Sequence, residues 1–303
     1  MWKGIFILLF SAILSGEVSS ERFIVRFGEG DEKLALEVLR LATGAREKVI
    51  ETLGFAPEEK VVIFLAEGDD NFFEIQQGVP KWAVGTAYPE KKKIFLRHPD
   101  NIILRYTGLK RLITHEYTHI ALGEAAGGLR VPRWLNEGLA SYVGGERGFS
   151  AYTTIAMASL TGSLIPLADL KNSFPDGSGR AELAYAESYS FVSYLEKRYG
   201  PGALRRLLSQ FFKTGNIQDA TISAFGRELA AIEAEWMQRI KRRYNWIFIF
   251  SGGLGLWFIM TLIFIAGYIR KRITTKSKMK LWELTEESGY ARDEEEDEPP
   301  TLH

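Results

Sequence analysis

The sequence predicts an α+β fold, with a small sheet near the amino terminus and a helical half after it. Short apolar runs typical of strands lie between residues 22 and 97, whereas after residue 100 the apolar residues recur at three- and four-residue steps. The chain has 303 residues, of which 46% are hydrophobic. This is enough for one ordinary globular domain with appendages.

The first half of the domain is predicted as strand, helix, strand and hairpin. Arg22–Phe27 alternates and is rich in β-branched residues, as strands are. Asp31–Leu53 has apolar residues at helical steps, with Asp31 as the expected cap and Gly54 as the stop. Lys60–Ala66 is a short buried strand. The turn at residues 89–91 joins two further strands, Trp82–Tyr88 and Lys92–Arg97.

The second half is predicted to contain only helices. An amphipathic helix is expected from about residue 102 to residue 122, and another opens at Pro132. Apolar residues at helical spacing then indicate three more helices, over Ala181–Tyr199, near Ala203–Lys213 and over Arg227–Arg243.

The most informative motif, His-Glu-Tyr-Thr-His, occupies residues 115–119 of the first of these helices. Positions i and i+4 share one helix face, so His115 and His119 can present two imidazoles to a single zinc ion. A catalytic zinc takes a third protein ligand and keeps a position for water, and Glu137 is the expected third ligand. Glu116 is placed to accept the proton of that water, whose pKa zinc lowers to about 7.

These motifs resemble those of the gluzincin peptidases, the aminopeptidase N and thermolysin-like clan, and most closely the bacterial peptidase MA-like domains. HEYTH is followed by WLNEGLASY, which contains Glu137. The resemblance implies a thermolysin-like catalytic domain over about residues 60–240, with an edge strand near Ala83–Tyr88 beside the zinc helix. It also implies zinc as cofactor and a peptide or protein as substrate, which could pair with the edge strand through main-chain hydrogen bonds.

A third segment, Ala184–Val192, resembles the part of aminopeptidase N relatives whose tyrosine stabilises the oxyanion. By its place in that segment the matching residue is Tyr185, and Tyr189, one turn later, is the alternative. Both tyrosines could instead simply pack within a helix.

One departure from the aminopeptidase pattern bears on specificity. Aminopeptidases of this clan carry a Gly-x-Met-Glu-Asn strand, whose glutamate holds the free amino terminus of the substrate. The matching stretch here is Gly85-Thr86-Ala87-Tyr88-Pro89-Glu90, so the methionine, glutamate and asparagine are absent from their places. An endopeptidase is therefore expected, and the alternative is an enzyme whose end preference the sequence does not define.

Composition excludes several other classes of function. Lysines and arginines number 38, as do aspartates and glutamates, so no basic excess suggests nucleic acid as a partner. The chain has no cysteine, which excludes disulfides, a cysteine-based zinc site and a thiol mechanism.

The two ends of the chain predict a membrane-anchored protein. Residues 1–20 resemble a secretory signal peptide with cleavage after Ser20, and a retained anchor is the alternative. The uncharged stretch Trp246–Ile269 is long enough to cross the bilayer as a helix. The catalytic domain, residues 21–243, is therefore expected outside the cytoplasmic membrane, with a largely disordered basic and acidic tail, residues 270–303, in the cytoplasm.

The sequence as a whole predicts a single-pass, zinc-dependent peptidase that cleaves peptide bonds outside the cytoplasmic membrane. The alternative is a pseudoenzyme, in which zinc only stabilises a membrane-tethered binding domain. Glu116 argues for the enzyme, because a structural zinc site needs no base.

Overall fold

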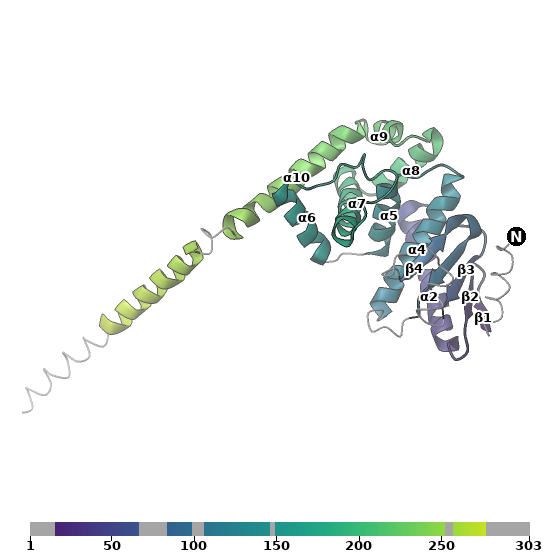
Figure 1. Cartoon of the computed structure of the whole chain (residues 1–303), viewed down its shortest axis with the longest axis horizontal. Helices are drawn as coiled ribbons and strands as arrows, with labels where there is room; N and C mark the ends of the chain where they lie inside the picture. Colours follow the sequence, from purple (N-terminus) through teal and green to yellow (C-terminus); the bar gives the residue numbers. More distant parts are fainter. Residues whose placement is uncertain (1–15, 67–83, 99–105, 146–148, 252–256, 277–303) are drawn as a thin grey trace, which may run out of the picture. The chain divides into compact units, whose positions relative to one another are not determined.

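The computed structural model describes residues 16–66, 84–98, 106–145, 149–251 and 257–276 (Figure 1). The chain divides into two units, Met1–Lys241 and Arg242–His303. The first unit combines a sheet with helices, which confirms the predicted α+β class.

The described strands of the first unit form a five-stranded sheet in the order β1-β2-β3-β5-β4. Strands β2, β3 and β5 are parallel to their neighbours within this group, whereas β1 and β4 pair antiparallel at the two ends of the order. The strands are β1 (Gly16–Ser19), β2 (Phe23–Phe27), β3 (Val61–Leu65), β4 (Gly85–Tyr88) and β5 (Lys93–Leu96). The predicted strands and the β4–β5 hairpin are therefore confirmed over the described residues, with the 3-10 turn Pro89–Lys91 between the last two. Trp82 and Ala83 of the predicted strand Trp82–Tyr88 lie outside the described part.

The sheet core is a row of aliphatic side chains across the three central strands. Val25 pairs with Ile63 and Ile63 with Ile94, and all three side chains are fully buried. Helix α2 (Glu32–Leu53) connects the parallel strands β2 and β3 and ends at Gly54, whose φ of 88° suits glycine. Helix α4 (Tyr106–Ala126) packs against α2 and against β4.

Strand β1 is not predicted from the sequence, because it lies inside the predicted signal peptide. It pairs with β2 over four residues, and Glu17 forms a 2.9 Å ion pair with Arg26. The turn is closed by Ser20, whose backbone N–H donates to Phe23 O over 2.8 Å and whose Oγ accepts from Phe23 N. Residues 1–15 lie outside the described part. Cleavage after Ser20 would remove β1 from the sheet.

The helical half packs around aromatic side chains. Trp134 and Trp236 both meet Phe191 edge-on, with ring centroids 5.3 and 5.4 Å apart. The helices are α5 (Arg133–Gly144), α6 (Phe149–Thr161), α7 (Ser178–Tyr199), α8 (Ala203–Thr214), α9 (Ile217–Phe225) and α10 (Leu229–Ser251). Helices α6 and α9 have no counterpart among the predicted elements, whereas the other four agree with prediction apart from their ends.

Helices α5 and α7 approach closely at Gly138. A methyl group at this position would lie 2.5 Å from the backbone oxygen of Ser188, a distance that packed atoms do not adopt. The glycine that follows Glu137 therefore lets α5 lie directly against α7, the helix that carries Tyr185.

The second unit contains a helix over residues 257–276 with exposed apolar side chains, among them Trp257 and Phe264. Among the described helices, none combines the length and the apolar character that a membrane span needs. The predicted span Trp246–Ile269 includes residues 252–256, which lie outside the described part.

Candidate active site

Helix α4 presents the motif histidines on one face and core residues on the other. Ile113 and Ile120 are fully buried, and the ring of Tyr117 packs on Phe23 of β2 at 5.3 Å. These contacts fix the rotation of the helix about its axis. His115 and His119, one turn apart, therefore lie together on the face away from the sheet, with ring centroids 4.8 Å apart.

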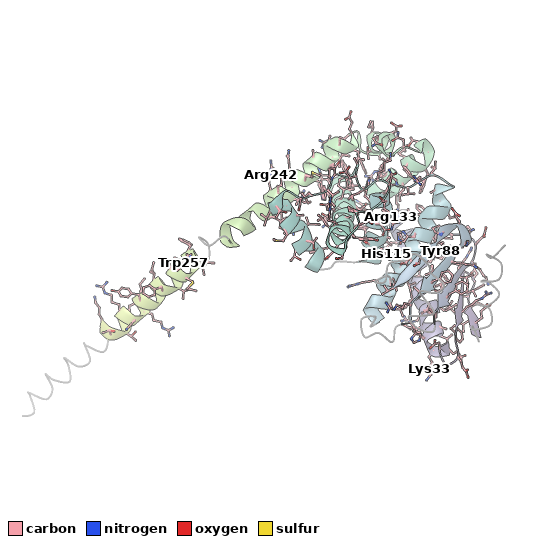
Figure 2. All side chains as sticks on the ribbon, in the orientation of Figure 1. Lys33, Tyr88, His115, Arg133, Arg242 and Trp257 are labelled. Carbon is pink, nitrogen blue, oxygen red and sulfur yellow. The ribbon has the colours of Figure 1, made fainter. Side chains whose placement is uncertain are left out.

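Helix α5 brings Glu137 to these two histidines. Its Oε2 atom lies 3.5 Å from Nε2 of His115 and 3.7 Å from Nε2 of His119. One ligand atom from each of the three residues lies within 4.8 Å of the others, close enough to share a metal ion. Figure 2 shows His115 and Arg133 in this part of the first unit, where α4 and α5 meet.

The charge state of the group suits a metal ion. Burial lowers the pKa of His119, so its ring is neutral and able to donate a lone pair. Burial alone would raise the pKa of Glu137, but the two histidines and Arg133 outweigh this effect and bring the pKa to about 2. The carboxylate is therefore ionised at neutral pH.

Two residues that the sequence does not single out support these ligands. Asn136 Oδ1 lies 2.9 Å from Nδ1 of His119, and Arg133 Nη2 lies 2.8 Å from Oε1 of Glu137. The only sequence signal for them is that Arg133 lies three residues before Asn136 and four before Glu137, the spacings at which helix side chains are neighbours. Such partners orient metal ligands in proteins.

Glu116 lies between the histidine face and the sheet. Its side chain is buried, and a methyl group on Gly85 of β4 would lie 3.0 Å from its Oε1 atom. Strand β4 is the last of the described strands in the sheet order, so it has a hydrogen-bonded neighbour among them on one side only. The carboxylate of Glu116 therefore stands beside the edge at which an extended chain could add.

Helix α7 places Tyr185 near the same group. Burial, followed by the charge of Glu137, raises the pKa of Tyr185 to about 12, and Glu116 also contributes to the rise. The hydroxyl is thus protonated at neutral pH, and the charges of both carboxylates act on its pKa. Tyr189, the alternative, is buried with its ring 6.5 Å from that of Tyr142.

The family model of the peptidase MA superfamily matches residues 41–242, which include every residue of this site. The chain belongs to the peptidase MA superfamily. Membership supports a zinc peptidase and confirms the family resemblance of the motifs. No protein of curated function matches the chain.

Solved structures of M1 zinc metallopeptidases are similar to the chain at low identity. One from Deinococcus radiodurans is 15% identical with a TM-score of 0.35, covering 75% of this chain and 50% of its own. A mutant of the Deinococcus enzyme is 15% identical with a TM-score of 0.38, and the match covers 74% of this chain and 51% of the mutant's chain. A two-domain M1 mutant bound to L-arginine is 14% identical with a TM-score of 0.40, and the match covers 75% of this chain and 50% of the mutant's chain. This chain spans about half the length of these proteins.

The donor set fits zinc. Two imidazole nitrogens and one carboxylate are the ligands of catalytic zinc sites that leave a fourth position for water or substrate. The described residues supply these three donors, and Asn136 and Arg133 restrain two of them. Both the family and the three donors therefore confirm zinc as the cofactor of this chain.

Proposed function

We propose that this chain is a membrane-anchored, zinc-dependent endopeptidase that cleaves peptide bonds outside the cytoplasmic membrane. The observation that carries the proposal is the position of Glu116. Glu116 directly follows His115 on α4, and its buried carboxylate lies against Gly85 of the edge strand.

His115, His119 and Glu137 would hold the zinc ion, which would supply Lewis acidity and lower the pKa of water. The Glu116 carboxylate accepts a proton from the water that attacks the scissile carbonyl. It then passes the proton to the nitrogen of the leaving amine, so that the peptide bond breaks with no net change at Glu116. The Tyr185 hydroxyl, protonated at neutral pH, donates a hydrogen bond to the oxyanion that develops on the carbonyl.

Strand β4 supports an extended substrate with little selection among side chains. A peptide that adds to the edge of β4 with which no described strand pairs is bound through main-chain hydrogen bonds. Tyr88 stands where the aminopeptidase pattern has its glutamate, and its ring contacts Phe95 edge-on at 5.7 Å. An aromatic ring offers no carboxylate to a free amino terminus at this position, which favours internal cleavage.

The membrane part of the proposal rests on the ends of the chain. The helix over residues 257–276 exposes large apolar side chains, and Arg270, Lys271 and Arg272 follow the uncharged stretch that ends at Ile269. Basic residues of this kind favour the cytoplasmic side. The predicted leader at the other end would then place the catalytic unit outside. Since β1 begins at Gly16, we expect any cleavage of the leader to occur before that residue.

A peptide-library assay with the full-length protein in detergent tests the activity. Glu116→Gln should keep zinc and lose at least about 100-fold in kcat/KM, because the base is removed while the ligands stay. His119→Ala should lose both zinc and activity. Full activity in Glu116→Gln would refute the mechanism. Zinc binding without turnover by the wild-type protein would favour the pseudoenzyme. The position of the cleaved bonds separates endopeptidase from exopeptidase action.

A further inference from the structure

Arg133 forms an ion pair with the metal-ligand candidate Glu137 that differs from an ordinary helix-surface pair. The two residues are one turn apart on α5, and Nη2 of Arg133 lies 2.8 Å from Oε1 of Glu137. Exposed pairs of this spacing contribute little to stability. Here, however, only 4% of the Glu137 side chain is exposed. A buried carboxylate depends on its partners, so the pair fixes where its oxygens point.

Because of this contact, the two carboxylate oxygens of Glu137 have different partners. Oε1 accepts from the guanidinium, whereas Oε2 faces Nε2 of both histidines at 3.5 and 3.7 Å. A carboxylate held in this way has one oxygen to offer to a metal ion. Without the guanidinium, Glu137 would be free to rotate or to offer both oxygens.

Arg133 is itself held by the segment between α6 and α7. Its backbone N–H donates to Lys171 O over 2.8 Å, and its guanidinium lies over the Phe174 ring, 5.7 Å from the centroid. The Phe174 ring meets Tyr185 edge-on, with centroids 4.9 Å apart and planes at 89°. The same aromatic ring therefore contacts both Arg133 and the proposed oxyanion donor.

We propose that Arg133 is a positioning residue. Its guanidinium restricts Glu137 to one ligating oxygen and, through Phe174, fixes the position of Tyr185 relative to that oxygen. The inference rests on the proposed metal centre and assigns a role outside its three ligands. Lysine cannot replace arginine in this role, because its ammonium lacks the planar donor fork and does not stack on a ring in the same way.

The test measures the zinc affinity of the full-length protein in detergent, by competition with a chromogenic chelator. Arg133→Met removes the guanidinium and keeps an apolar stem, whereas Arg133→Lys keeps the charge. Arg130→Met is the matched control, since Arg130 is exposed and lies three residues before Arg133. Loss of a residue that orients a metal ligand weakens metal binding roughly 10–100-fold. We expect the loss of zinc affinity to be near the upper end of this range in Arg133→Met and near the lower end in Arg133→Lys. Arg130→Met should bind zinc as the wild type does.

The absorption spectrum of the cobalt-substituted protein provides a second readout, because it reports the coordination number of the metal. It should change in Arg133→Met and not in Arg130→Met, whereas a loss of general stability would leave it as in the wild type. Wild-type zinc affinity in either folded Arg133 variant would overturn the inference. A wild-type protein without zinc affinity would instead overturn the metal centre and the proposed function with it.

Discussion

The Nδ1 atom of His119 lies 2.9 Å from the Oδ1 atom of Asn136. An amide oxygen only accepts hydrogen bonds, so Nδ1 of the histidine must carry the hydrogen. The lone pair of the ring is then on Nε2, the atom that faces Glu137. Asn136 thus selects the tautomer of His119 that can bind a metal ion.

Replacing Asn136 should weaken zinc binding without unfolding the protein. Asn136→Ala leaves His119 free to change tautomer and ring orientation, and we expect its zinc affinity to fall roughly 10–100-fold. Asn136→Asp keeps an acceptor for the Nδ1 hydrogen of His119, so its zinc affinity should fall less than that of Asn136→Ala. Chelator competition measures both values. Equal affinities in the alanine variant and the wild type would show that the ring is held by other contacts.

Gly85 allows β4 to lie against Glu116, so a side chain there should disturb the base. A methyl group would lie 2.9 Å from Leu112 Cδ1 and 3.0 Å from Glu116 Oε1. Displacement of a catalytic group by about 1 Å can lower the rate about 100-fold. We expect Gly85→Ala to reduce kcat/KM by tenfold or more and Gly85→Val by more still, with zinc content unchanged.

Gly44→Ala is the control for this prediction. Gly44 lies within α2, where an added methyl group meets nothing within 4 Å. The activity of Gly44→Ala should equal that of the wild type. Similar losses at Gly85 and Gly44 would mean that the effect arises from general destabilisation.

The buried carboxyl of Glu187 on α7 predicts a pH dependence of stability. Burial, partly opposed by its hydrogen bond from the Ile165 backbone, raises its pKa from 4.5 to about 8, and Glu233 adds to the rise. Between these two pH values the folded protein keeps a proton that the unfolded chain has lost. This group therefore lowers stability as pH rises from 4.5 to 8, by up to about 1.4 kcal/mol per pH unit.

Glu187→Gln isolates this effect, since the amide oxygen can still accept from Ile165 N–H and does not titrate. Relative to the wild type, the variant should gain Tm between pH 5 and pH 8, by roughly 2–4 °C for each kcal/mol. Thermal unfolding of both proteins at the two pH values gives the difference. A Tm difference that is the same at both pH values would contradict the raised pKa.

Strand β1 predicts where the mature chain begins. Its four pairs with β2 cover Val25 and Phe27, both buried, so its removal would expose apolar surface at that end of the sheet. We expect the protein isolated from host membranes to begin at or before Gly16. Intact-mass analysis and amino-terminal sequencing measure this directly. A mature chain that starts at Glu21 would show that the domain is stable without the strand.

The ligands could be predicted from the sequence because their geometry is local. His115 and His119 share a helix face by spacing alone, and strong periodicity predicts α2, α4 and α7. The roles of Asn136 and Arg133 depend on how α5 lies against α4, which no local pattern encodes. Strand β1 is hidden because it follows an apolar leader-like run without a break. The catalytic roles of Glu116 and Tyr185 stay predictions, since geometry places them but does not measure turnover.

The packing of α4 against α5 bears on how the protein behaves without its metal. Their connection is short, over residues 127–132, and ends at Pro132, and the two helices are in contact. An ion that links His119 to Glu137 would close a loop of only 18 residues, so it removes little chain entropy. Trp134 and Gly138 already seat α5 on α7. The apoprotein should therefore stay folded with its donors in place, so that zinc can be withdrawn and restored reversibly.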